Sequence, residues 1–188
     1  MKEKKWKISS RQKKLLDSLF EKIKNSEIKS VLDMGAGRTS VHYLANRFKN
    51  IKIKAVVYPG DERKIKPILE CVPEKNYEII ENDIKNLKIK KVDLILAHLF
   101  LGEAEKFAGN KFEDILKRLF AIKTKYLVIV NVERDSINYW LLFKHIANNG
   151  IVLKISYVNR PDKEGDICLG FTIKKMEKIK DLSGRSLS

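Results

Sequence analysis

Apolar residues recur along this chain at two alternating spacings, which predicts a fold that mixes helices and strands. Helical spacing first appears after Ser9 or Ser10, either of which can cap the helix. Four more helical segments follow, and the last begins at Asp135 or Ser136 and ends at Asn149-Gly150. The apolar positions of the first helix are Leu15, Leu16, Leu19, Phe20 and Ile23; the last helix carries Ile137, Trp140, Leu141 and Ile146.

Short apolar runs between the helical segments predict seven strands. They span about 30–34, 51–57, 77–80, 92–97, 126–130, 151–158 and 167–174. The fourth and fifth runs are almost continuously apolar, as is typical of strands buried on both faces. The last two runs flank a turn at 160–165 and favour an antiparallel hairpin. The pattern therefore predicts an α/β three-layer sandwich, with a seven-stranded, mostly parallel sheet and a C-terminal antiparallel hairpin.

Length and composition favour one domain. The chain has 188 residues, of which 44% are hydrophobic. We expect a basic N-terminal arm at 1–8, a single domain at 9–175 and a disordered tail at 176–188. No apolar run is long enough for a membrane span or a signal peptide, so we expect a cytoplasmic protein with no membrane partner. Cys71 and Cys168 lack metal-ligand spacing, so we expect no metal site and interpret both as small buried apolar residues.

The net charge of +15 comes from 39 Lys and Arg against 24 Asp and Glu. The excess is greatest in residues 1–14, where seven basic residues accompany only Glu3. This segment is the best candidate for contact with a nucleic-acid backbone, and Trp6 within it could stack on a base. Lysine-rich genome composition is an alternative source of the charge, and Trp6 could instead hold the arm against the domain.

The segment most suggestive of chemistry is Asp33-Met34-Gly35-Ala36-Gly37, which joins the first strand to the second helix. The two glycines lack a β-carbon where a tight turn must let a ligand approach the backbone. The preceding carboxylate suits a ligand with hydroxyl and cationic groups better than a pyrophosphate. Ser40 stands where the dinucleotide-binding fingerprint has its third glycine, so that fingerprint is disfavoured.

This segment resembles motif I of the class I S-adenosylmethionine (SAM)-dependent methyltransferases, and the order of elements resembles their fold from Ser9 to Lys175. The resemblance implies that SAM is the cofactor. It also implies that its methionine part and ribose edge lie against Asp33, Gly35, Ala36 and Gly37. Family members place an acidic residue after the second strand, to bind the ribose. Here Tyr58 stands at that position and Asp61 lies three residues further on, so either could contact the ribose.

The resemblance extends to the ends of the third and fourth strands. Asp83 and Ile84 match the residues that bind the adenine amino group and pack on the ring, although Asp83 could equally be a turn residue. Ala97 ends the fourth strand beside the expected cofactor. His98 follows it, and we interpret His98 as a residue that orients or deprotonates the methyl acceptor, with a purely structural histidine as the alternative. Asn131, Glu133 and Arg134 end the fifth strand, where they could contact the acceptor, and Glu103 is more typical of a helix start.

These patterns favour a SAM-dependent methyltransferase that acts on a small-molecule acceptor rather than on RNA. Two alternatives stay open: a SAM-binding protein of this fold that transfers no methyl group, and a basic RNA-binding module that has lost the site. The chain lacks the Asp/Asn-Pro-Pro-Tyr tetrapeptide and the Pro-Cys nucleophile of DNA base methyltransferases, which argues against those acceptors. The oligomeric state is left open by the sequence.

Overall fold

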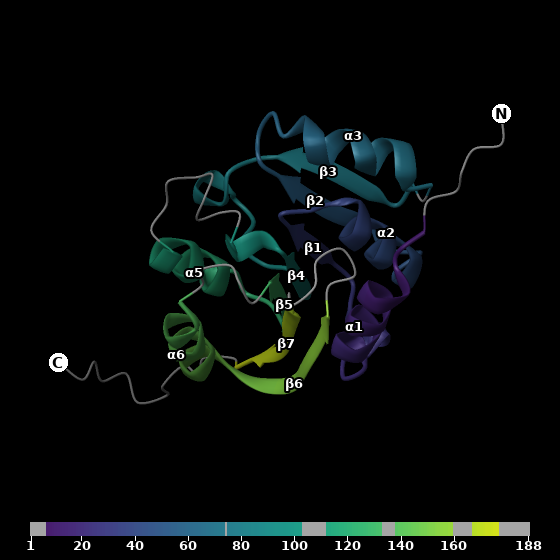
Figure 1. Cartoon of the computed structure of the whole chain (residues 1–188). Coiled ribbons are helices and arrows are strands. Elements are labelled where there is room, and N and C mark those ends of the chain that lie inside the picture. The colour runs from purple at the N-terminus through teal and green to yellow at the C-terminus, as the bar shows by residue number, and fades with distance from the viewer. Residues whose placement is uncertain (1–6, 74, 103–111, 133–137, 160–166, 177–188) are drawn as a thin grey trace.

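Seven strands form one sheet in the order β3-β2-β1-β4-β5-β7-β6 (Figure 1). The computed structural model describes residues 7–73, 75–102, 112–132, 138–159 and 167–176. The strands are β1 (Val31–Met34), β2 (Ile53–Val57), β3 (Tyr77–Glu81), β4 (Leu94–His98), β5 (Tyr126–Val132), β6 (Gly150–Asn159) and β7 (Ile167–Lys175). The predicted strands are thus all present, with small differences at their ends.

The first five strands are parallel to one another, whereas β7 is antiparallel to both β5 and β6. This topology confirms the predicted mostly parallel sheet with a C-terminal antiparallel hairpin. Parallel pairing brings the carboxyl ends of β1 to β5 to one edge of the sheet. The strands β2 and β3 lie on one side of β1, whereas β4 lies on its other side. In open α/β sheets, ligands bind where the order of strands changes direction in this way.

Helices cover both faces of the sheet (Figure 1). On one face lie α1 (Ser10–Phe20), α2 (Arg38–Arg47) and α3 (Glu62–Cys71), and on the other lie α5 (Phe112–Ala121) and α6 (Tyr139–Asn149). Two short 3-10 turns, η1 (Asn25–Glu27) and η2 (Ile84–Asn86), complete the described elements. Alternate residues of the buried strands face the two layers, so the sheet separates two apolar cores.

The helix α1 is positioned by its cap and by one apolar side. The Ser9 side chain accepts a hydrogen bond from the Gln12 N–H, as a cap should. Leu19 is fully buried, and its carbonyl accepts a bond of 2.5 Å from the Thr172 hydroxyl of β7. A β-carbon on Gly170 would overlap Leu19, so this glycine lets α1 lie close to the sheet.

The start of α6 differs from the prediction. Asp135 and Ser136 lie outside the described residues, and α6 begins at Tyr139, where the Asn138 side chain accepts from the Leu141 N–H at 3.0 Å. Trp140, expected on the buried side, has 80% of its surface exposed. At the other end, Gly150 has an extended backbone with φ of −173°, so the expected left-handed cap does not form.

The predicted N-terminal arm lies almost wholly outside the described residues, as does the tail after Met176. Both stay predictions. Cys168 is buried and Cys71 is half-buried, which agrees with their interpretation as packing residues. Within the described segments, no helix combines the length and the apolar character needed to cross a membrane.

Candidate functional site

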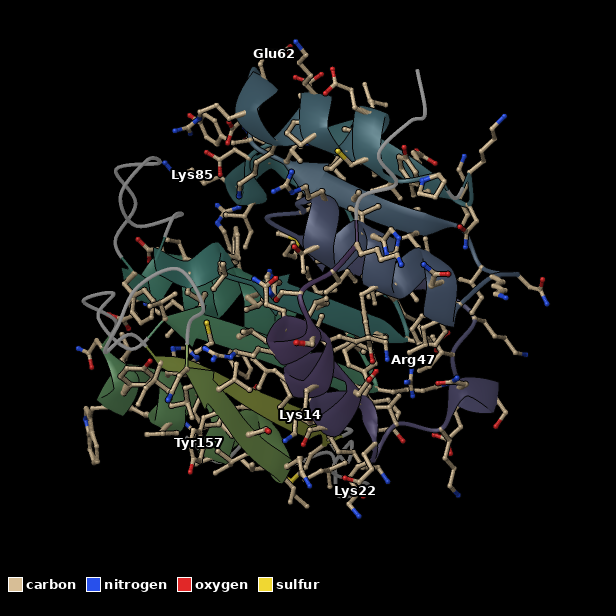
Figure 2. The ribbon with its side chains drawn as sticks, turned by 45° about the vertical axis from the view of Figure 1, so that its right-hand side comes forward. Lys14, Lys22, Arg47, Glu62, Lys85 and Tyr157 are labelled. Carbon is tan, nitrogen blue, oxygen red and sulfur yellow. The ribbon has the colours of Figure 1, made fainter. Side chains whose placement is uncertain are left out.

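A cavity of about 390 Å³ opens at the carboxyl edge of the sheet, where β1, β2 and β3 end. Its size is within the range of small-molecule and cofactor sites. Glu62, at the start of α3, lines it, and Lys85 of η2 lies in the turn that borders it; both are labelled in Figure 2. The described lining residues are Met34, Gly35, Val56, Val57, Tyr58, Pro59, Gly60, Asp61, Glu62, Arg63, Lys64, Asn82, Asp83, Ile84 and Phe100.

The first glycine of the β1–α2 turn is required both by its backbone and by its neighbour. Gly35 has a φ of +69°, which L side chains rarely adopt. A β-carbon there would lie 2.9 Å from Cβ and Cδ2 of Phe100, which follows β4. The next residue, Ala36, donates its N–H to the Val56 carbonyl at 2.8 Å, which ties the turn to β2. The turn is therefore held between its two neighbouring strands.

The second glycine has a different role. Gly37 has an extended φ of −141°, and a β-carbon there would meet no atom within 4 Å. Its N–H donates to the Ser40 hydroxyl and its carbonyl accepts from the same hydroxyl, both at 3.1 Å. Ser40 is fully buried, and its hydroxyl therefore satisfies the backbone of Gly37 at the start of α2. Gly37 thus keeps open space beside the start of α2.

Asp33 is the most perturbed acidic residue of the site. It is fully buried, and among the described residues neither carboxyl oxygen has a hydrogen-bond partner. Burial raises the pKa of Asp33 to about 8, although the nearby Ser40 hydroxyl and the Lys64 ammonium oppose this rise. At neutral pH the carboxyl is therefore mostly protonated. The sequence suggested an acidic, ligand-facing loop, but Asp33 lies behind the cavity lining and is mostly neutral.

Lys64 was not identified from the sequence, yet it connects several parts of the site. Its ammonium group donates to the Gly35 carbonyl at 3.3 Å and lines the cavity. Its charge acts on both Asp33 and His98 and lowers the pKa of each. In a chain with so many lysines, only the position of α3 over the turn distinguishes this one.

The β2–α3 loop supplies Tyr58 and Asp61 to the cavity. Asp61 stands at the cap position of α3, but its carboxylate accepts from the Arg63 side chain at 3.1 Å rather than from the helix backbone. Gly60 has a φ of +73°, and its N–H donates to the Glu81 carboxylate of β3 at 3.0 Å. Glu81 therefore holds the loop, and Asp61 is one of the acidic side chains that line the cavity.

Asp83 and Ile84 follow β3 and also line the cavity. The Asp83 carboxylate accepts from the Lys85 N–H at 3.0 Å and caps η2, so the turn-residue interpretation is correct. The two interpretations are compatible, because a carboxylate can accept several hydrogen bonds. Ile84 is 7% exposed and supplies an apolar wall.

His98 ends β4 and is buried, with 9% of its surface exposed. Burial, assisted by the positive charge of Lys64, lowers the pKa of His98 to about 4, so the ring is neutral at pH 7. The following residue, Leu99, has a φ of +57° and donates its N–H to the Val130 carbonyl at 2.7 Å. A left-handed leucine is an uncommon conformation that neighbouring structure must maintain.

The cavity brings together Gly35, Tyr58, Asp61, Asp83 and Ile84 from the predicted site. The lining does not include the remaining predicted residues: Asp33, Ala36, Gly37, Ala97 and His98. Glu103, Glu133 and Arg134 lie outside the described residues, whereas Asn131 is fully buried. In the described part of the chain, no cluster of His, Cys, Asp or Glu could hold a metal ion.

One prediction concerns the folded state and uses Asp33→Asn. A carboxyl whose pKa is raised on folding stabilises the fold at low pH and loses that contribution as pH rises toward the folded value. Between pH 6.5 and 8, the free energy of unfolding of the wild type should therefore fall by about 1 to 2 kcal/mol relative to that of Asp33→Asn. The lowered pKa of His98 makes the free energy of unfolding rise with pH, but it does so mainly below pH 6.5. Urea unfolding at several pH values measures the difference, and parallel curves would contradict it.

Comparison with known proteins supports the fold. No family model and no curated protein sequence matches the chain. The N-methyltransferase NodS from Bradyrhizobium japonicum, solved with S-adenosyl-L-homocysteine, is 13% identical, with a TM-score of 0.65 over 89% of this chain and 86% of that one. A proposed RNA methyltransferase from Pyrococcus horikoshii is 17% identical, with a TM-score of 0.63 over 88% and 84%.

A third similar structure is a 1,6-didemethyltoxoflavin-N1-methyltransferase from Burkholderia thailandensis, solved with its substrate and S-adenosylhomocysteine. It is 18% identical, with a TM-score of 0.61 over 89% of this chain and 79% of that one. These identities are low, but the structures agree over most of their lengths. The sheet order and these similarities together show that the chain has the fold of the class I SAM-dependent methyltransferases.

Proposed function

We propose that this protein is a SAM-dependent methyltransferase whose cofactor binds in the cavity at the ends of β1, β2 and β3. The observation that carries the proposal is the enclosure of this cavity by the glycine turn, the β2–α3 loop and the β3–η2 turn. SAM supplies a methyl group bonded to a positively charged sulfur. The protein then has to hold the cofactor, exclude water and align the acceptor.

The lining residues fit the parts of the cofactor. Val56, Ile84 and Phe100 offer apolar walls for a flat heterocycle, and the carboxylates of Asp61 and Asp83 can accept hydrogen bonds from hydroxyl or amino groups. Asp61 takes the role of the acid that is missing directly after β2. The open space beside Gly37, close to the buried Asp33, suits the amino-acid end of the ligand.

His98 is our candidate for the residue that orients or deprotonates the acceptor. It ends the strand next to β1, and because burial lowers its pKa to about 4, its ring is unprotonated at pH 7 and keeps a nitrogen lone pair for the acceptor. The left-handed Leu99 fixes the backbone directly after it. Strain of this kind is often retained where a side chain must be aimed.

A small-molecule acceptor is favoured over RNA because one described cation of α1 and one of α2 already have partners within the protein. Lys13 pairs with Asp17 at 2.7 Å. Arg47 donates to the Phe20 carbonyl at 3.2 Å and to Asn25 at 3.1 Å. Cations that already have such partners contribute less to binding a phosphate backbone, because those contacts would have to be exchanged.

Cofactor binding is tested by Gly35→Ala. The new methyl group would need a strained φ and would press on Phe100, so we expect the turn to shift and the affinity for S-adenosylhomocysteine to fall by at least about tenfold. Leu69→Ala is the control, because Leu69 lies on α3, is 62% exposed and does not line the cavity. Calorimetry measures binding, and circular dichroism confirms folding. Unchanged affinity in folded Gly35→Ala would contradict the assignment.

The acceptor class is tested with methyl-labelled SAM, a metabolite extract and total RNA. We expect label to enter small molecules, and the Gly35→Ala variant should reduce that incorporation. Incorporation into RNA alone would show that the order of preference is wrong. Cofactor binding without incorporation into either pool would favour a SAM-binding protein that transfers no methyl group.

The role of His98 is tested by His98→Ala once an acceptor is known. SAM affinity should stay within a few-fold, and turnover should fall by about a hundredfold or more, which is typical of a positioned acid or base. In the wild type, the His98 ring must be neutral to orient or deprotonate the acceptor. The methyl-transfer activity should therefore persist down to about pH 5 and fall as the pH approaches 4. Steady-state kinetics across pH measures both effects. Unchanged turnover in the variant would make His98 a structural residue.

A further inference from the structure

The strand β6 forms an open edge of the sheet. Within the described residues its only paired neighbour is β7, and its other side has no strand beside it (Figure 1). The strand spans ten residues, Gly150–Asn159, with a register shift between Val152 and Lys154. An edge of this length offers unpaired backbone groups to another strand. The regular part, from Lys154 to Asn159, is the part best able to pair.

The side chains of this edge lack the usual protection against pairing. Ile155 is 57% exposed and Tyr157, labelled in Figure 2, is 68% exposed. Natural edge strands are commonly blunted by charged side chains or proline. Here Lys154 is the one charged residue of the strand, and it is bound at 3.0 Å to Glu21, the residue that follows α1. The edge is therefore apolar and close to neutral in a chain of net charge +15.

The neighbouring helix α6 extends the apolar surface. Its Phe143 is 44% exposed and stacks edge-on against Phe171 of β7, with ring centroids 5.6 Å apart. Phe171 in turn pairs with Ile155 in the β6–β7 ladder. Trp140 lies three residues before Phe143 on the same helix and is 80% exposed. We call Trp140, Phe143, Ile155 and Tyr157 the β6 surface.

We propose that the β6 surface binds a second copy of this chain, with the two β6 strands antiparallel about a two-fold axis at Ser156. In this register each Ile155 lies opposite Tyr157 of the other copy. The dimer therefore contains two such cross-strand pairs, each made of a β-branched and an aromatic residue. Such cross-strand pairs are among the more stabilising ones. The result is a continuous sheet through both copies, with an isologous interface.

Charge favours a second copy over a polyanion as the occupant. Two chains of charge +15 repel each other over most of their surfaces. The β6 edge adds little to this repulsion, because its one lysine, Lys154, is bound to Glu21. A nucleic acid would need cations along the strand, and the sequence of β6 has none besides Lys154.

The interface lies away from the proposed cofactor cavity. In the sheet, β1, β2 and β3 stand at one end and β6 at the other, with β4, β5 and β7 between them. Self-association therefore leaves the cavity open, and the inference does not depend on the proposed function. Cofactor binding and dimerisation should be separable by mutation.

The first experiment is light scattering coupled to size exclusion, over a range of protein and salt concentrations. We expect a mass twice that of the 21.8 kDa chain, with dimerisation strengthened by salt, because salt screens the repulsion of the remaining charges. The double variant Ile155→Lys/Tyr157→Lys should raise the dimer dissociation constant by at least about tenfold. Leu69→Lys is the matched control, since Leu69 is a 62% exposed apolar residue on α3, and it should remain dimeric. A wild type that stays monomeric at its highest soluble concentration would overturn the proposal.

The second experiment tests the register with an engineered disulfide. Opposed residues of an antiparallel pair have Cα atoms about 4.5 to 5.5 Å apart, which a disulfide can bridge. In a background with Cys71→Ser and Cys168→Ala, Ser156→Cys should form a cross-linked dimer on mild oxidation. Ile151→Cys, on the same strand but far from the axis, should not. Equal cross-linking of both variants, or of neither, would contradict the proposed pairing.

Discussion

The close approach of two turns organises the candidate site. Gly35 after β1 and Phe100 after β4 are so close that even one β-carbon would not fit between them. Because β1 and β4 are adjacent parallel strands, this contact sets the wall of the cavity at the point where the sheet changes direction. The Ala36 bond to β2 then fixes the other side of the turn. The loops that follow β2 and β3 are arranged around this fixed element.

Burial determines the protonation of the two titratable residues next to the β1–α2 turn. Asp33 and His98 are both held mostly neutral at pH 7, the first because burial raises its pKa and the second because burial lowers it. Lys64 acts on both of them while also reaching the Gly35 carbonyl. Beside Asp33 and His98 a cationic ligand would therefore meet neutral groups and the Lys64 ammonium, whereas the acidic side chains of Asp61 and Asp83 line the cavity itself. The exposed edge β6 has the opposite character, with apolar side chains and little unpaired charge.

The fold was predictable because burial on two faces leaves a strong pattern in the sequence. The runs at β4 and β5 are almost continuously apolar and are buried throughout, and the turn chemistry of the last hairpin is equally plain. The start of α6 was not predictable from Asp135 or Ser136, because Asn138 is an equally good cap and Trp140 faces solvent. In the site, glycine spacing identified the turn. It could not show that Gly35, unlike Gly37, needs a left-handed backbone, or that Lys64 reaches over from α3.

The order of strands also has a consequence for biosynthesis. The strand β1 carries the glycine turn, yet its partner β4 is more distant in sequence, and Phe100 follows that partner. A chain emerging from the ribosome therefore presents the turn well before it can close the cavity, since such long-range pairings form slowly. The strand β7 inserts between β5 and β6, so the β6 edge is fixed only after β7 has been synthesised. Until then its apolar residues are available to chaperones.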